Sequence, residues 1–267
     1  MGSAPLLGQG SFGLVHRVRA VSSGRLFAIQ ILREGAGESA LALADEARRL
    51  WTCQGPHVVP LHAAFRTGHA ITGIRMALAD VSLNVFLDSR EGGLPEQASQ
   101  HILVQTCLGA AHVHSKGLVH RDLKPGNVLL RFDPCGHGVL RVWLADFGKA
   151  CEAPPARHQR QADTMAVLAG RRLSRTLRWP WSQQACAIQY AAPEILQGLP
   201  AGCSADAWSL GAIGFEMIMG RRLVMQNTAQ SALAELKDQR NGTSVLPEGR
   251  CDATWCKDSS RVVKRSM

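Results

Sequence analysis

The sequence lacks any apolar stretch of the roughly 18 residues that a membrane-spanning helix needs. Its first residues, MGSAPLLGQG, also lack the basic stretch and long apolar core of a signal peptide. Glycine and proline are scattered without a period, which excludes a collagen-like repeat. We therefore expect an intracellular protein, cytoplasmic or nuclear, with no membrane span.

Paired cysteines at zinc-binding spacing are also missing. The chain has 8 cysteines, but none of them forms a CxxC pair. Cys251 and Cys256 stand closest together, and no histidine near them completes a metal-ligand set. In the expected compartment these thiols are reduced and mostly buried.

What is present is enough material for a folded core with a basic surface. The 267 residues are 46% hydrophobic and 19% charged, which excludes a disordered chain and allows one large domain or two small lobes. The net charge of +9 suits an acidic partner, or simply a basic surface in water. The arginines concentrate between 157 and 178 without interleaved aromatic residues, so we expect no specific nucleic-acid partner.

The hydrophobic pattern divides the chain into a strand-rich front and a helical back. Alternating and short apolar runs predict strands, and apolar residues at helical spacing predict helices. The expected strands lie within 6–33, 58–65, 71–79, 128–130 and 140–143, and the expected helices at 39–51, 95–115, 208–219 and 229–240. This order predicts an α+β, two-lobed protein, with an N-lobe over 1–79 and a C-lobe over 80–267.

A glycine-rich motif, GxGxxG, stands at Gly8 to Gly13. Dinucleotide-binding folds share this motif, but there the glycines open a helix. Here they lead into an alternating run through Val15, as in a hairpin whose backbone N–H groups approach phosphate oxygens. A plain glycine-rich hairpin is the alternative for this motif taken alone.

Four further motifs follow in a fixed order: HRDLKPGN at 120–127, DFG at 146–148, APE at 192–194 and DAWSLG at 206–211. With the glycine-rich loop, this series resembles the eukaryotic protein kinases of the serine/threonine type, from Leu6 to about Arg222. The resemblance implies a small antiparallel-sheet N-lobe, a larger helical C-lobe, ATP and Mg²⁺ as cofactors, and a protein substrate.

The resemblance also implies a role for each matched residue. Asp122 would take the proton of the acceptor hydroxyl, Lys124 would steady the γ-phosphate, and Asn127 and Asp146 would bind Mg²⁺. Phe147 would stack with Leu50 and His120 in a column that links the lobes. The implied nucleotide-binding residues are Leu7, Gly8, Gln9, Gly10, Ser11, Phe12, Gly13, Val15, Ala28, Gln30 and Leu129.

The chain departs from the family at the strand that should read V-A-I-K and here reads FAIQ. Gln30 replaces the phosphate-binding lysine, so Glu46, which matches its helix partner, has no ion pair there. The glycine-rich loop holds no lysine to replace it, and we expect Arg17 and Arg19 to face outward. Losing one preorganised charge costs about 10²–10³ in rate, which predicts a weak or inactive enzyme.

Two more departures concern the C-lobe. Ala187 replaces a threonine that in the family contacts the catalytic aspartate and lysine. The helical lobe is shorter than the family's, and only Arg250 and Arg261 are candidates for the arginine that pairs with Glu194. An unpaired buried Glu194 would destabilise the lobe.

The activation segment, 146–194 by this resemblance, is long and basic. The run Arg171-Arg172-Leu173-Ser174 suits an upstream kinase that prefers basic substrates. We expect phosphorylated Ser174 or Thr176 to pair with Arg121 and order the segment, the alternative being a loop with incidental serines.

Three interpretations therefore remain open from the sequence. The chain is an ATP-dependent serine/threonine kinase of reduced activity, a pseudokinase that binds nucleotide or a partner, or a fragment that folds poorly. The first depends on the matched catalytic residues, and the other two on Gln30, Ala187 and the short C-lobe.

Overall fold

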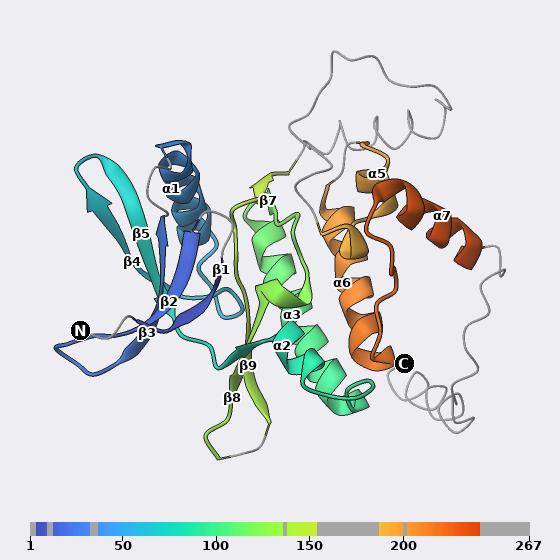
Figure 1. Cartoon of the computed structure of the whole chain (residues 1–267), viewed down its shortest axis with the longest axis horizontal. Coiled ribbons are helices and arrows are strands. Elements are labelled where there is room, and N and C mark those ends of the chain that lie inside the picture. The colour runs from blue at the N-terminus through green and yellow to red at the C-terminus, as the bar shows by residue number, and fades with distance from the viewer. Residues whose placement is uncertain are drawn as a thin grey trace, which may run out of the picture.

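The computed structural model describes residues 4–9, 13–32, 37–135, 138–153, 187–199 and 202–240. Figure 1 shows a sheet with one helix beside it at one end of these residues and a group of helices at the other. Among the described residues, no helix is both long enough and apolar enough to cross a membrane.

The first part is a five-stranded antiparallel sheet in the order β1-β2-β3-β5-β4. Its strands are β1 (Leu6–Gln9), β2 (Gly13–Arg19), β3 (Leu26–Leu32), β4 (Leu61–Thr67) and β5 (Ala70–Ala77). Helix α1 (Gly37–Thr52) contacts β3, β4 and β5. Its Leu43, Ala47 and Leu50 are buried at helical spacing, so burial of this apolar stripe holds the helix to the sheet.

The register of β3 places residues for the site on one face. Ala28 pairs with Arg17 on one side and Met76 on the other, and Gln30 pairs with Val15 and Ile74. Because side chains alternate along a strand, Ala28 and Gln30 point to the same face. Gly13 lies so close to β3 that an added Cβ would come within 2.0 Å of the Ile31 carbonyl oxygen.

The second part is mainly helical. Its helices are α2 (Leu83–Asp88), α3 (Glu96–Ser115), α5 (Pro193–Leu196), α6 (Cys203–Met219) and α7 (Ala229–Arg240). Helices α3 and α6 contact each other. This part also contains short antiparallel strand pairs. They are β6 (Val81–Ser82) with β8 (Val128–Phe132), β8 with β9 (Val139–Leu144), and β7 (Leu118–Val119) with β10 (Cys151–Glu152).

One hydrophobic core joins the sheet to the helices. It includes Leu50 of α1, Ile74 of β5, Ile213 of α6, and Phe147 in the segment after β9. All four side chains are at most 1% exposed. The predicted α+β, two-lobed arrangement, with an antiparallel sheet followed by helices, is confirmed.

Three differences from the sequence pattern have a clear physical reason. Strand β4 begins at Leu61 rather than near 58, because Val58 instead forms a bridge with Leu144 in the second part. Helix α6 begins at Cys203, five residues before the expected Trp208, because its first turns hold small and polar residues without an apolar period. Helix α2 was not predicted, since 6 residues are too few to show a helical period.

Asp206 of α6 ties the helical core to the loop that follows β7. Its carboxylate is 1% exposed and accepts backbone hydrogen bonds from His120 N and Arg121 N, both at 2.8 Å. The Nε2 atom of His114, on α3, lies 2.8 Å from the same carboxylate. Arg121 has a φ of 68°, a left-handed conformation that is unfavourable for arginine and that these bonds stabilise.

We expect Asp206→Ala to lower the free energy of unfolding by roughly 3–5 kcal/mol, because it removes a charged acceptor from two buried N–H groups. Urea denaturation of the full chain measures this change. Asp88→Ala, at the exposed end of α2, is the matched control and should change stability by less than about 0.5 kcal/mol. Equal effects of the two substitutions would contradict the role given to Asp206.

Candidate functional site

The loop held by Asp206 presents a second buried carboxylate, Asp122, which is 2% exposed. Lys124 Nζ donates a hydrogen bond to its Oδ2 atom at 2.7 Å. Asn127 Nδ2 donates to Oδ2 at 3.2 Å and to the Asp122 carbonyl oxygen at 2.8 Å. On the other side, Lys149 Nζ lies 3.2 Å from Oδ1. The two flanking lysines and the Asn127 amide fix the orientation of this buried carboxylate.

The segment after β9 closes the site from a second direction. Asp146 has a φ of 63°, and its Oδ1 atom accepts a hydrogen bond from Gly148 N at 3.4 Å. Phe147 is fully buried, and its ring packs against the His120 ring with 4.9 Å between centroids. Leu50, His120 and Phe147 are all buried, and the column that links the lobes through them stays a prediction.

Asn127 and Asp146 are the candidate ligands for Mg²⁺. The amide nitrogen of Asn127 donates hydrogen bonds to Asp122. The amide oxygen of Asn127 is then the atom that could bind a metal ion. Within the described ranges, no group of three or more His, Cys, Asp and Glu side chains could hold a metal alone. Two oxygen ligands from the protein nevertheless fit Mg²⁺, which usually takes its remaining ligands from water and substrate phosphates.

Gln30 and Glu46 meet where the resemblance implies a lysine–glutamate ion pair. Gln30 Nε2 donates to Glu46 Oε2 at 3.2 Å, and both side chains are at most 3% exposed. Burial, followed by the negative charge of Asp146, raises the pKa of Glu46 to about 8. The hydrogen bond from Gln30 lowers this pKa only in part, because a neutral amide cannot compensate a buried charge.

The raised pKa of Glu46 makes stability depend on pH. The unfolded carboxyl ionises near its ordinary pKa of 4.5 and the folded one near 8, so the unfolding free energy falls as the pH rises between these values. We expect this loss to reach about 1.4 kcal/mol per pH unit, and Glu46→Gln to remove it. Urea denaturation from pH 5 to pH 9 measures the slope. Glu91→Gln, at an exposed position, is the control and should keep the wild-type slope.

Arg49, one turn after Glu46, ties α1 to the segment after β9. Its Nη1 atom donates to the Phe147 carbonyl oxygen at 3.4 Å and to that of Gly148 at 3.2 Å. Sequence reasoning missed this residue, since an arginine late in a helix is equally typical of a favourable interaction with the helix dipole. The contact holds the helix against the site without the usual ion pair.

We expect Arg49→Met to loosen α1, because two carbonyl oxygens lose a charged donor at a cost of about 1–2 kcal/mol. Hydrogen exchange should show faster exchange of the α1 amides. Arg48→Met is the matched control, because Arg48 is exposed and pairs only with Asp45 on the same helix. If the two variants exchange alike, Arg49 does not hold the helix.

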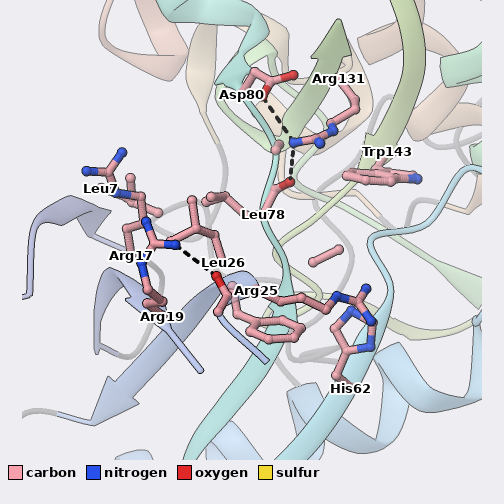
Figure 2. A pocket seen from close by; sticks show the side chains of 14 residues that line it. Leu7, Arg17, Arg19, Arg25, Leu26, His62, Leu78, Asp80, Arg131 and Trp143 are labelled. Atoms are coloured by element: carbon pink, nitrogen blue, oxygen red, sulfur yellow. Dashed lines mark hydrogen bonds and ion pairs between the residues drawn. The ribbon is translucent and has the colours of Figure 1, made fainter. Parts of the chain in front are cut away.

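Of the expected adenine-binding residues, Val15 and Ala28 belong to the sheet of the first part and Leu129 to β8 of the second. Val15 and Leu129 are half-buried and Ala28 is buried. Arg131 on β8 fixes the segment that joins the two parts: its Nη1 atom lies 3.3 Å from the Leu78 carbonyl oxygen and 3.1 Å from Asp80 Oδ1, as Figure 2 shows.

This joining segment, residues 77–80, lines a pocket of about 660 Å³. Figure 2 shows Leu7 at one side of it and Trp143 at the other. Arg17 and Arg19 are exposed and line this pocket, and the register of β2 against β3 puts both on the face that carries Ala28 and Gln30. Arg19 Nη1 donates to the Gly24 carbonyl oxygen at 2.9 Å.

Several predicted residues cannot be placed. Gly8 and Gln9 belong to β1 and Gly13 begins β2, whereas the calls at Gly10, Ser11 and Phe12 lie outside the described residues. The same holds for Ser174 and Thr176, and for the candidate partners of Glu194, Arg250 and Arg261.

The described end of the activation segment is anchored by an acid that sequence reasoning did not single out. Tyr190 donates its hydroxyl proton to Glu216 Oε2 at 2.6 Å. Burial and then the neighbouring Glu216 raise the pKa of Tyr190. Arg222 Nε lies 3.6 Å from Glu216 Oε1, so an acid–arginine pair does form in this part of the chain. Ala187, one turn before Tyr190, is half-buried and brings no hydroxyl to the site.

Comparison with known proteins identifies the family. The model of the protein kinase domain matches residues 3–264, so the chain belongs to the protein kinase family. Ribosomal protein S6 kinase alpha-1 of Homo sapiens is 34% identical over 224 residues, which cover 80% of this chain and 26% of the relative. Ribosomal protein S6 kinase beta of Caenorhabditis elegans is 30% identical over 223 residues, 80% of this chain and 35% of the relative. The chain thus spans about a quarter to a third of the curated relatives it matches.

Proposed function

We propose that this protein transfers the γ-phosphoryl group of ATP, with Mg²⁺, to serine or threonine hydroxyls of protein substrates. The arrangement around Asp122 supports this most directly. Its carboxylate is buried, held in one orientation by Lys124 and Asn127, and faces a cation on either side. Phosphoryl transfer needs little covalent chemistry from the protein, so a fixed base and nearby positive charge are the main requirements.

The roles of the matched residues follow from their chemistry. Asp122 accepts the proton of the attacking hydroxyl, and Lys124 neutralises charge on the transferred group. Asn127 and Asp146 would hold Mg²⁺ through their side-chain oxygens, and the bound ion would offset the negative charge of the phosphates. Val15, Ala28 and Leu129 supply apolar contacts to the adenine.

The backbone of Gly8 to Gly13 approaches the phosphates in this proposal. Lobes over 1–79 and 80–267, and an activation segment over 146–194, remain part of it. So does ordering of that segment when phosphorylated Ser174 or Thr176 pairs with Arg121, after the action of an upstream kinase that prefers basic substrates.

A second candidate is a pseudokinase that binds nucleotide or a protein partner without transfer. It is favoured by the neutral contact between Gln30 and Glu46 and by Ala187, since each removes a group that would act on the phosphates or on Asp122. Positioning would survive these changes, whereas the rate would fall by about 10²–10³ for the missing charge.

Transfer of labelled phosphate from ATP with Mg²⁺ to a mixed protein substrate distinguishes the two candidates. We expect slow transfer by the full chain and a further loss of at least about 10²-fold in Asp122→Asn, which keeps the shape of the side chain without its basicity. Asp88→Asn is the matched control and should transfer at the wild-type rate. Transfer that survives Asp122→Asn would contradict the assigned base. No transfer, combined with a melting temperature raised by ATP, would establish the binding module.

A further inference from the structure

Lys149 is a charged residue at the site that the proposed roles do not use. It follows Gly148 directly, and its Nζ atom lies 3.2 Å from Asp122 Oδ1. Its side chain is 28% exposed, much like that of Lys124 at 30%, whereas the carboxylate between them is 1% exposed. The two ammonium groups therefore reach the same buried carboxylate at different oxygens, and both side chains remain partly exposed to solvent.

The charge of the site shows what Lys149 could compensate. With Gln30 at the lysine position, β3 brings no cation, and Glu46 remains beside Asp146 without a positive partner in the sheet. Phosphates carry several negative charges, so a cleft that binds them needs positive groups aimed at them. Arg49 is used by the carbonyl oxygens of Phe147 and Gly148. Lys149, which contacts the Asp122 carboxylate opposite Lys124, is placed to add positive charge there.

The position of Lys149 is determined by its neighbours. Arg49 holds the Gly148 carbonyl oxygen, which belongs to the peptide that leads into Lys149. Asp122 Oδ1 accepts no well-aligned hydrogen bond from any described residue. The Lys149 ammonium forms an ion pair with this oxygen. Ala187 brings no hydroxyl that would compete for this oxygen.

We propose that Lys149 is a phosphate-binding residue of the cleft, which supplies with Lys124 the positive charge that Gln30 lacks. The ligand it recognises is the terminal phosphate of a nucleoside triphosphate. This inference rests on the proposed nucleotide site and deepens it, but it does not require that transfer occur. Lysine suits this task because its ammonium is a compact charge on a flexible stem, able to leave one oxygen anion for another.

Two readouts on the full chain test the proposal: the rate of phosphate transfer, and the rise in melting temperature with Mg²⁺ and ATP compared with Mg²⁺ and ADP. We expect Lys149→Gln to lower the transfer rate about 10²-fold. We also expect it to abolish the larger stabilisation by ATP than by ADP. Lys149→Arg should retain both properties, and adding Gln30→Lys to Lys149→Gln should recover at least about tenfold in rate. Lys237→Gln, on the exposed face of α7, is the matched control and should behave as wild type.

The outcomes separate this proposal from the proposed function. If the wild type transfers no phosphate, the proposed activity fails, but a preference for ATP that Lys149→Gln abolishes still supports Lys149. A Lys149→Gln variant that matches the wild type in both readouts, or transfers faster, overturns the proposal, because the lysine would then be structural or inhibitory. If Lys149→Gln does not fold, the single variant Gln30→Lys decides between the outcomes.

A gain in its transfer rate below about tenfold supports a site that already holds its cation. A gain of about 10²-fold or more overturns the proposal.

Discussion

The buried carboxylate of Asp206 is the interaction on which the site depends. It accepts hydrogen bonds from two consecutive backbone N–H groups and contacts His114, so one side chain joins α6, α3 and the loop after β7. The bonds hold Arg121 in a left-handed conformation that an arginine would otherwise avoid. Asp122 is the next residue, so its direction follows from this strained but well-bonded backbone.

A second set of contacts carries this order into the sheet. His120 packs on Phe147 and lies 3.1 Å, through Nε2, from the Ala145 carbonyl oxygen. Phe147 and Gly148 accept hydrogen bonds from Arg49, which belongs to the helix packed on the sheet. A closely packed core is rigid, so a displacement of α1 would disturb the segment from Asp146 to Lys149.

The sequence was informative where residue identity itself determines chemistry or conformation. The two-lobed order of strands and helices followed from apolar periodicity, and the positions of Asp122, Lys124, Asn127 and Asp146 from unbroken motifs. Their roles remain predictions. The pattern could not reveal Arg49 or Glu216, because the value of each depends on which carbonyl or hydroxyl lies opposite in space. It also misjudged the start of α6, where Ala205 and Asp206 are buried for packing and hydrogen bonding rather than in an apolar period.

The resemblance implies a lysine at the position of Gln30, and such a lysine would combine two effects. A lysine there would position α1 and also bring charge to the phosphates. In this chain the positioning is retained, because Gln30 still reaches Glu46 and Arg49 adds its own bonds to the neighbouring turn. The charge is not retained at that point, and burial, followed by the negative charge of Asp146, raises the pKa of Glu46 to about 8. Any loss of rate should therefore come from electrostatics rather than from a displaced helix, which is why a cation elsewhere in the cleft, such as Lys149, could offset it without rebuilding the fold.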